Sequence, residues 1–261
     1  MHHTPFRVSN GLIDDESSLR ARLENDGYLF LRGIAPKDRI LTVRREILEL
    51  LRDAGWIDRS APLMDGIWSG VGPYTEGDPE YMAVYRDVLH MQSFVDLPAD
   101  AAFMKIMAKI LGGEPLLHRR RIGRITFPNN TQQTTAAHQD FHYIRGTPQT
   151  YTIWLPIGDC PIELGGLAVL SGSHKQGFIE HRLHPEKKYA GHGLGDDQLP
   201  PGTRWHADDF ELGDFVIFHS HTIHKALPNL TENRLRLSAD NRFQLAGSAI
   251  EAGSMGTHYD L

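Results

Sequence analysis

Two side chains near the middle of this 261-residue chain could bind one metal ion together. His138 and Asp140 stand two positions apart within the segment 135–143. In an extended segment, residues i and i+2 lie on the same face, so the imidazole and the carboxylate would point the same way. Two ligands alone make a weak site, and the same pair could equally be a hydrogen-bonded loop pair. A metal site therefore requires a third ligand from elsewhere in the chain.

The run 218–224 contains three histidines that could supply this ligand. His224 is favoured because a turn at Gly213 and a strand-like run precede it, and it stands near the end of an element where side chains can converge. His219 and His221 share a face of the same extended segment, and each alone is typical of a packed or surface histidine. Two histidines and one carboxylate form the facial triad of non-heme Fe(II) oxygenases, which leaves coordination positions open.

The composition restricts the class of protein. Lys+Arg 27 against Asp+Glu 33 gives a net charge of −6, which argues against nucleic acid as a partner. The single basic cluster, Arg119–Arg121, is interpreted as a solvated patch or as anchors for an anionic ligand. One cysteine, Cys160, excludes an intrachain disulfide framework and suits a reducing compartment. The start of the chain does not look like a signal peptide, and no apolar run is long enough to cross a bilayer, so we expect a cytoplasmic protein without membrane contact.

Local patterns divide the chain into a helical part and a strand-rich part. Helical spacing with capping signals predicts helices over 15–27, 36–55, 79–89 and 99–111, with a short strand at 28–31 and a long loop at 56–77. Short β-type runs follow, at 116–127, 150–157, 167–170, 215–218 and 235–243. No repeated strand-helix-strand spacing is visible, so we expect a sandwich or a barrel. The aperiodic segment 181–210 predicts a long loop over one mouth of it, of the kind that often serves as a mobile lid.

With these residues in view, the chain resembles the phytanoyl-CoA dioxygenase family of Fe(II)- and 2-oxoglutarate-dependent oxygenases. The resemblance depends on ordered blocks that together span about 85–243: 138–143, Trp154, 165–174, 213–224 and Arg236. It implies a mainly β fold with flanking α, a double-stranded β-helix (a cupin-like jelly roll) with N-terminal helices packed on one sheet. We expect a single domain over 1–261, with a helical part at about 1–114 and a jelly-roll core at about 115–245.

The resemblance also implies the roles of several residues. His138, Asp140 and His224 would hold Fe(II). Arg236 stands where the family places the arginine that binds the far carboxylate of 2-oxoglutarate, and a guanidinium can bind a carboxylate through two parallel hydrogen bonds.

The remaining co-substrate contacts follow from the same strand and from the family blocks. Ser238 lies on the same strand face as Arg236 and could add a hydroxyl donor. Arg234 shares that face and is the rival, although Arg236 has the family's Arg-x-Ser form. Trp154 matches a strand tryptophan of the family, and His90 stands where some members carry a lysine near the keto acid.

The activity implied is hydroxylation of an unactivated C–H bond in a small molecule, with dioxygen consumed, 2-oxoglutarate decarboxylated to succinate, and ascorbate as reductant. The same iron centre could instead catalyse desaturation, epoxidation or cyclisation. Halogenation is disfavoured, because related halogenases have a small residue in place of Asp140. A jelly roll that binds metal without turnover is the alternative from another class, and it would have no need of Arg236.

Overall fold

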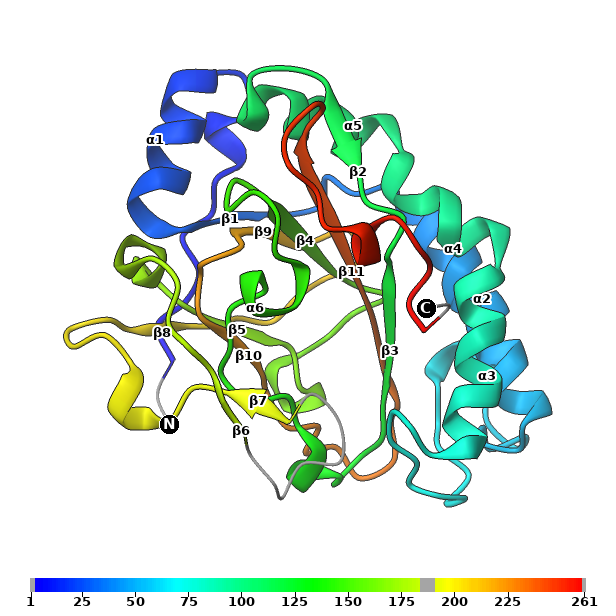
Figure 1. Cartoon of the computed structure of the whole chain (residues 1–261). Coiled ribbons are helices and arrows are strands. Elements are labelled where there is room, and N and C mark those ends of the chain that lie inside the picture. The colour runs from blue at the N-terminus through cyan, green and yellow to red at the C-terminus, as the bar shows by residue number, and fades with distance from the viewer. Residues whose placement is uncertain (1–2, 184–190, 260–261) are drawn as a thin grey trace.

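The computed structural model describes residues 3–183 and 191–259 and contains two main antiparallel β-sheets (Figure 1). The larger sheet has the order β1-β9-β4-β11-β2, with β3 also paired to β11, and the smaller has the order β10-β5-β8. A separate ladder joins β6 to β7. The strands are β1 (Tyr28–Leu31), β2 (Pro115–Leu117), β3 (Ile122–Thr126), β4 (Tyr151–Pro156), β5 (Leu167–Leu170), β6 (Arg182–Leu183), β7 (His192–Gly193), β8 (Trp205–His206), β9 (Phe215–His219), β10 (His224–Ala226) and β11 (Arg236–Leu245).

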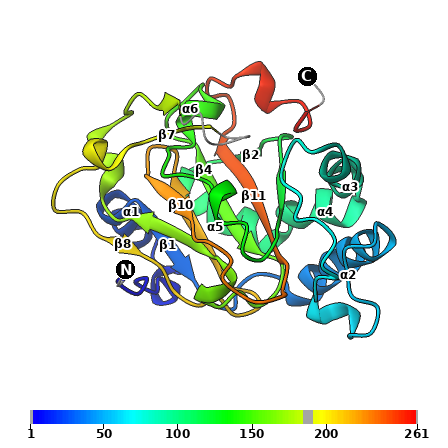
Figure 2. The ribbon, with the colours of Figure 1, turned by 90° about the horizontal axis from the view of Figure 1, so that it is seen from below.

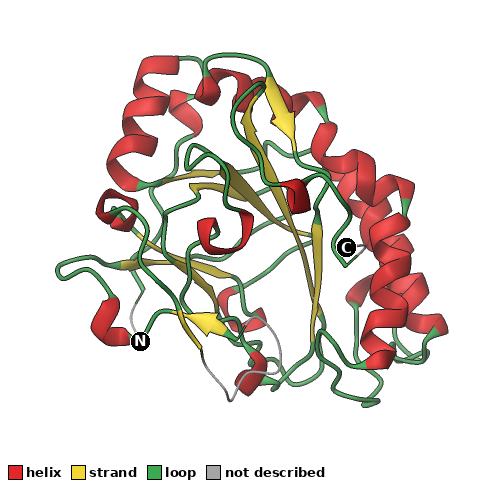
Figure 3. Cartoon of the chain, viewed as in Figure 1, coloured by secondary structure: helices red, strands yellow, loops and turns green. Residues whose placement is uncertain are grey.

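Helices from the first half of the chain cover the outer face of the larger sheet (Figures 2 and 3). They form where apolar side chains recur at helical spacing, as Ile40, Val43 and Ile47 do in the second helix. Asp15 caps the start of the first helix, where its carboxylate accepts hydrogen bonds from two backbone N–H groups, and a left-handed Gly27 caps its end. The helices are α1 (Glu16–Asp26), α2 (Lys37–Asp53), α3 (Pro79–His90), α4 (Gln92–Asp96), α5 (Ala101–Leu111) and the short α6 (Phe141–Ile144).

The strands of the larger sheet alternate between two buried environments. In β11, Leu237, Ala239 and Phe243 pack against the helices. The intervening side chains face the space between the two sheets, where aromatic and aliphatic residues of both sheets also meet. These intervening residues of β11 are polar or charged and all are buried: Arg236, Ser238, Asp240, Arg242 and Gln244. One strand thus lines the interior with a row of polar groups, because its side-chain period is two.

This architecture is the predicted one, with N-terminal helices packed on one sheet of a jelly roll. Among the described residues, the two main sheets stay separate and do not close into a continuous barrel. The single-domain organisation stays a prediction, and it is supported by β1, which comes from the helical part and pairs with β9 of the core. No helix in the described ranges is both long and apolar enough to cross a membrane.

The structure corrects three local predictions. The run 116–127 is two strands, β2 and β3, separated by the arginine cluster, and α4 was not predicted. The segment 181–210 is not a plain loop: β6, β7 and β8 lie in it, and β8 pairs with β5 of the smaller sheet. Strands of two residues are too short to produce a recognisable period. The part of the predicted lid at 184–190 lies outside the described residues.

Candidate metal centre

His138, Asp140 and His224 converge between the two sheets. One ligand atom from each lies within 4.8 Å of the others, and all three side chains are buried. The distance from the Asp140 Oδ1 atom to the Nε2 atom of either histidine is 3.9 Å. Within the described chain, this is the one group of three or more His, Cys, Asp or Glu side chains with such geometry. A cation between these atoms would have two imidazoles and one carboxylate as ligands.

A backbone bridge holds the two histidines together. The His138 N–H donates to the His224 carbonyl at 2.9 Å, and the His224 N–H donates back at 3.0 Å. Each Nδ1–H donates to a nearby carbonyl, of Ala136 at 2.8 Å and of Thr222 at 3.0 Å, which leaves both Nε2 lone pairs free for a metal. Burial, and then the proximity of His224, lowers the pKa of His138 to about 3. Burial also lowers the pKa of His224. Both rings therefore favour the neutral form that metal ligands require.

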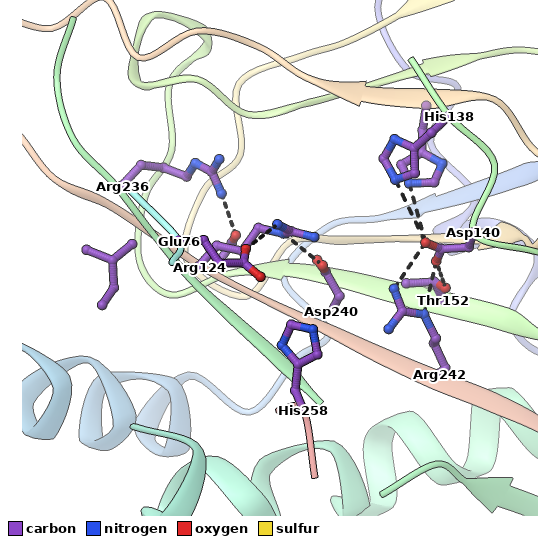
Figure 4. A network of polar contacts seen from close by, with 12 residues as sticks. Glu76, Arg124, His138, Asp140, Thr152, Arg236, Asp240, Arg242 and His258 are labelled. Carbon is purple, nitrogen blue, oxygen red and sulfur yellow. Dashed lines mark hydrogen bonds and ion pairs between the residues drawn. The ribbon is translucent and has the colours of Figure 1, made fainter. Parts of the chain in front are cut away.

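Asp140 does not reach this position in the way the sequence pattern suggested. Its backbone is helical, with φ −57° and ψ −32°, because it stands at the start of α6. Strand alternation therefore does not explain why it faces the metal position beside His138. Its orientation is fixed instead by the larger sheet, as Figure 4 shows.

Arg242 and Thr152 anchor the Asp140 carboxylate. Arg242 donates from Nη2 to Oδ1 at 3.0 Å and from Nε to Oδ2 at 3.2 Å, and the Thr152 hydroxyl donates to Oδ2 at 2.5 Å. The two donors are partners in the β4/β11 register, so the sheet presents both to one carboxylate. Burial alone would raise the pKa of Asp140, but Arg242 and the two histidines outweigh this and lower it. The carboxylate is therefore ionised and held in place.

Sequence reasoning missed both anchors. The signal for Arg242 was available, because it lies on the same face of β11 as Arg236 and Ser238. Nothing in the local sequence marked Thr152, whose role depends on its register with β11.

A cavity connects the metal position to Arg236. Its walls include all three candidate ligands, Trp154 and Arg236. The Arg236 side chain is only 3% exposed, its Nη1 donates to Ser238 Oγ at 2.5 Å, and its Nε has no hydrogen-bond partner among the described residues. The Trp154 ring centroid lies 6.0 Å from the Cζ atom of Arg236. Arg234, the rival, lines a different cavity beside Arg44 and Asp159.

The structure does not bring His90 to this site, which corrects that prediction. His90 is exposed in the last turn of α3, on the outer layer, and its Nδ1 donates to the Arg86 carbonyl at 2.7 Å. The other two histidines of the run 218–224 lie outside the group of ligands. These are His219 and His221, and the His221 N–H donates to His219 Nδ1. His174 also lies outside the group of ligands, and its Nε2 is hydrogen-bonded to the Glu24 backbone carbonyl of α1.

A family model described as phytanoyl-CoA dioxygenase matches residues 23–237. The chain belongs to the phytanoyl-CoA dioxygenase family. The 1-deoxypentalenic acid 11-beta-hydroxylase of Streptomyces exfoliatus is 28% identical over 248 residues, which cover 91% of this chain and 84% of that protein. The enzyme of the same name from Streptomyces arenae is 28% identical over 250 residues, with the same coverage.

Solved structures that contain 2-oxoglutarate (alpha ketoglutarate) have the same fold. The epimerase SnoN, in complex with Fe3+, alpha ketoglutarate and nogalamycin RO, gives a TM-score of 0.64 at 18% identity and covers 91% of this chain and 86% of its own. EctD from S. alaskensis, with 2-oxoglutarate and 5-hydroxyectoine, gives 0.60 at 18% identity and covers 92% and 79%. The predicted family, fold class and oxygenase activity of this phytanoyl-CoA dioxygenase family member are confirmed.

Proposed function

We propose that this member of the phytanoyl-CoA dioxygenase family uses Fe(II), 2-oxoglutarate and dioxygen to hydroxylate a C–H bond of a small molecule. One observation carries the proposal: a buried cluster of two histidines and one carboxylate shares a cavity with a buried arginine that has no acidic partner among the described residues. The hydroxylases from Streptomyces, which act on a small carboxylic acid by name, support hydroxylation over the other outcomes of such a centre.

The three ligands fit Fe(II). Neutral imidazole nitrogens and a carboxylate suit a divalent first-row metal, and three ligands on one side leave positions for 2-oxoglutarate and dioxygen. The hydrogen bonds from Arg242 and Thr152 to Asp140 keep the carboxylate from turning away, as the partners of metal ligands commonly do. Ascorbate would serve as the reductant that keeps the iron in the Fe(II) state.

The far end of the cavity fits the C5 carboxylate of 2-oxoglutarate. The unpartnered Nε of Arg236 is a buried donor that needs an acceptor, and a carboxylate can accept from Nε and a terminal nitrogen together. Ser238 holds the other terminal nitrogen, which restricts rotation of the guanidinium. Trp154 supplies an apolar wall beside it.

The chain's own contribution to the reaction is binding and orientation. When bound, iron and 2-oxoglutarate supply the oxidising chemistry, in which CO2 is lost and one oxygen atom of dioxygen enters succinate while the other enters the C–H bond. Arg236 would set the position of the co-substrate, and Asp140 and the two histidines would hold the metal at the other end of the same cavity.

The test is an anaerobic titration of the iron-loaded protein with 2-oxoglutarate. We expect the weak visible charge-transfer band of a chelated keto acid, and we expect it to be lost in His224→Ala. A second cavity-facing change, Arg236→Leu, should shift the titration without removing the metal. If 2-oxoglutarate neither changes the spectrum nor binds to the iron-loaded wild type, the proposed function is wrong. Metal content of a purified sample decides little, because nickel, copper and zinc can also bind such ligands.

A further inference from the structure

The middle residue of the arginine cluster lines a cavity beside two of the candidate metal ligands. Arg120 lies in the connection between β2 and β3 and lines a cavity of about 160 Å³ whose walls also include His138 and Asp140. The flanking arginines do not line this cavity: Arg119 is exposed, and Arg121 donates to the Arg119 carbonyl at 3.3 Å. The cluster therefore places one guanidinium, and not three, in a cavity that His138 and Asp140 also line, and Arg236 is not among the lining residues of this cavity.

The other arginines of this cavity are already neutralised. Arg124 pairs with Asp240 at 3.0 Å and lies 3.7 Å from Glu76 (Figure 4). Arg242 is held by the Asp140 carboxylate, as described above.

The two tyrosine hydroxyls that line the cavity have hydrogen-bond partners as well. Tyr259 donates to Glu76, and Tyr143 donates to a backbone carbonyl. Burial, together with the positive charge of Arg120, lowers the pKa of His258 to about 3, so this imidazole is neutral. Of the three arginines that line the cavity, Arg120 is the one that forms no ion pair with an acidic side chain among the described residues.

A half-buried cation without a counter-ion favours an anionic ligand. Burial, and then the positive charge of Arg242, lowers the pKa of Arg120, which shows that its surroundings are unfavourable to the bare cation. A planar guanidinium matches a carboxylate in shape and charge, whereas a phosphate group carries nearly two charges and would need a second cation. Apolar side chains, Ile122 and Ile144, line the same cavity and suit a hydrocarbon body.

We propose that the primary substrate is a small monocarboxylic acid with an apolar body, and that Arg120 binds its carboxylate and so presents a distant C–H bond to the metal. This inference rests on the proposed function, and it names the substrate class for the same site. It also makes a CoA thioester an unsuitable substrate, because esterification removes the carboxylate that Arg120 would bind.

The experiment compares acids with their methyl esters. The iron-loaded full chain with 2-oxoglutarate is assayed for substrate-stimulated succinate release, with 1-deoxypentalenic acid, decanoic acid and cyclohexylacetic acid as probes. Arg120→Gln removes the charge inside the cavity, and Arg119→Gln is the matched control, since it makes the same charge change on an exposed neighbour. We expect stimulation by at least one acid and by none of the esters.

The variants should differ in the acid concentration that they need for half-maximal stimulation of succinate release. Arg120→Gln is expected to raise the acid concentration needed for half-maximal stimulation by about ten- to a hundred-fold, and Arg119→Gln should leave it unchanged. Arg120→Lys keeps the charge without the planar fork and should fall between them, which provides a second reading if the glutamine variant folds poorly. Equal behaviour of the Arg120 and Arg119 variants, stimulation by esters as strong as by acids, or no response to any acid would overturn the inference.

A measurement of 2-oxoglutarate binding distinguishes failure of this inference from failure of the proposed function on which it rests. The anaerobic titration is repeated without probe on the wild type and on Arg120→Gln. If the wild type binds 2-oxoglutarate but no acid acts through Arg120, the inference alone fails. If the wild type does not bind 2-oxoglutarate, the proposed function itself is wrong.

Discussion

Replacing Arg236 by methionine should stabilise the free protein while removing most of its affinity for 2-oxoglutarate. The side chain is 3% exposed, its pKa is lowered chiefly by burial, and no ion pair joins it to a described acidic residue. A buried charge without a counter-charge is unfavourable, and replacing buried ionic groups by apolar ones of similar volume is often stabilising by about 1–4 kcal/mol. Because the cavity can admit water, we expect the lower part of this range, about 1–2 kcal/mol.

The same change should cost much more in co-substrate binding. Losing a buried, charge-assisted carboxylate contact typically costs about 2–5 kcal/mol, which is roughly thirty- to several-thousand-fold in affinity. Stability and binding therefore move in opposite directions, and a merely structural arginine would not behave in this way.

Thermal melting and calorimetric titration of protein loaded with Mn(II), which avoids turnover, would measure both effects. Without 2-oxoglutarate, the melting temperature of Arg236→Met should rise by about 2–8 °C, since 1 kcal/mol corresponds to about 2–4 °C at this size. With 2-oxoglutarate at about a hundred times the wild-type dissociation constant, the wild type should gain about 2.7 kcal/mol, and the variant at most about 0.9 kcal/mol if its affinity falls thirty-fold or more.

The matched control is Arg234→Met, which removes an arginine two residues away that lines a different cavity. It should leave 2-oxoglutarate binding unchanged. The reasoning is refuted if Arg236→Met is less stable than the wild type without ligand, or if it still binds 2-oxoglutarate normally. If Arg234→Met loses the co-substrate instead, the binding arginine is misassigned by one step of strand alternation.

Thr152→Val should weaken metal binding by roughly ten-fold or more, because it removes a hydroxyl donor from the metal-binding Asp140 carboxylate. The control Thr150→Val loses only a hydrogen bond to a backbone carbonyl and should leave metal binding unchanged. Competition titrations with Co(II) would measure this, and equal affinities for the two variants would contradict the anchoring role. Gly27→Ala should lower the free energy of unfolding by about 2–4 kcal/mol, since φ is +77° and the new Cβ would lie 2.5 and 2.9 Å from two side-chain atoms. Gly33→Ala, with φ +67° and nothing within 4 Å, should cost about 1 kcal/mol in denaturant unfolding. His90→Ala should bind 2-oxoglutarate as the wild type does in the same calorimetric titration, and any loss would restore His90 as a co-substrate residue.

Residue types and local periods were enough to predict much of this protein. The helices followed from apolar side chains at helical spacing, since one helical face must be buried. The alternation of β11 placed Arg236 and Ser238 on one face, and the structure brings them into contact. His138 and Asp140 were found by their chemistry, because few side chains can bind a metal.

Only the tertiary structure decided how these residues meet. The sequence argument put His138 and Asp140 on one face of a strand, yet the cluster is assembled by a backbone bridge between His138 and His224 and by the sheet beneath Asp140. Arg242 reaches that carboxylate because β11 pairs with β4 in one particular register. Registers between distant segments depend on the packing of the whole core, and no local pattern encodes them. For the same reason Arg120 could be seen as part of a basic cluster, but not as the one member of that cluster that lines a cavity beside His138 and Asp140.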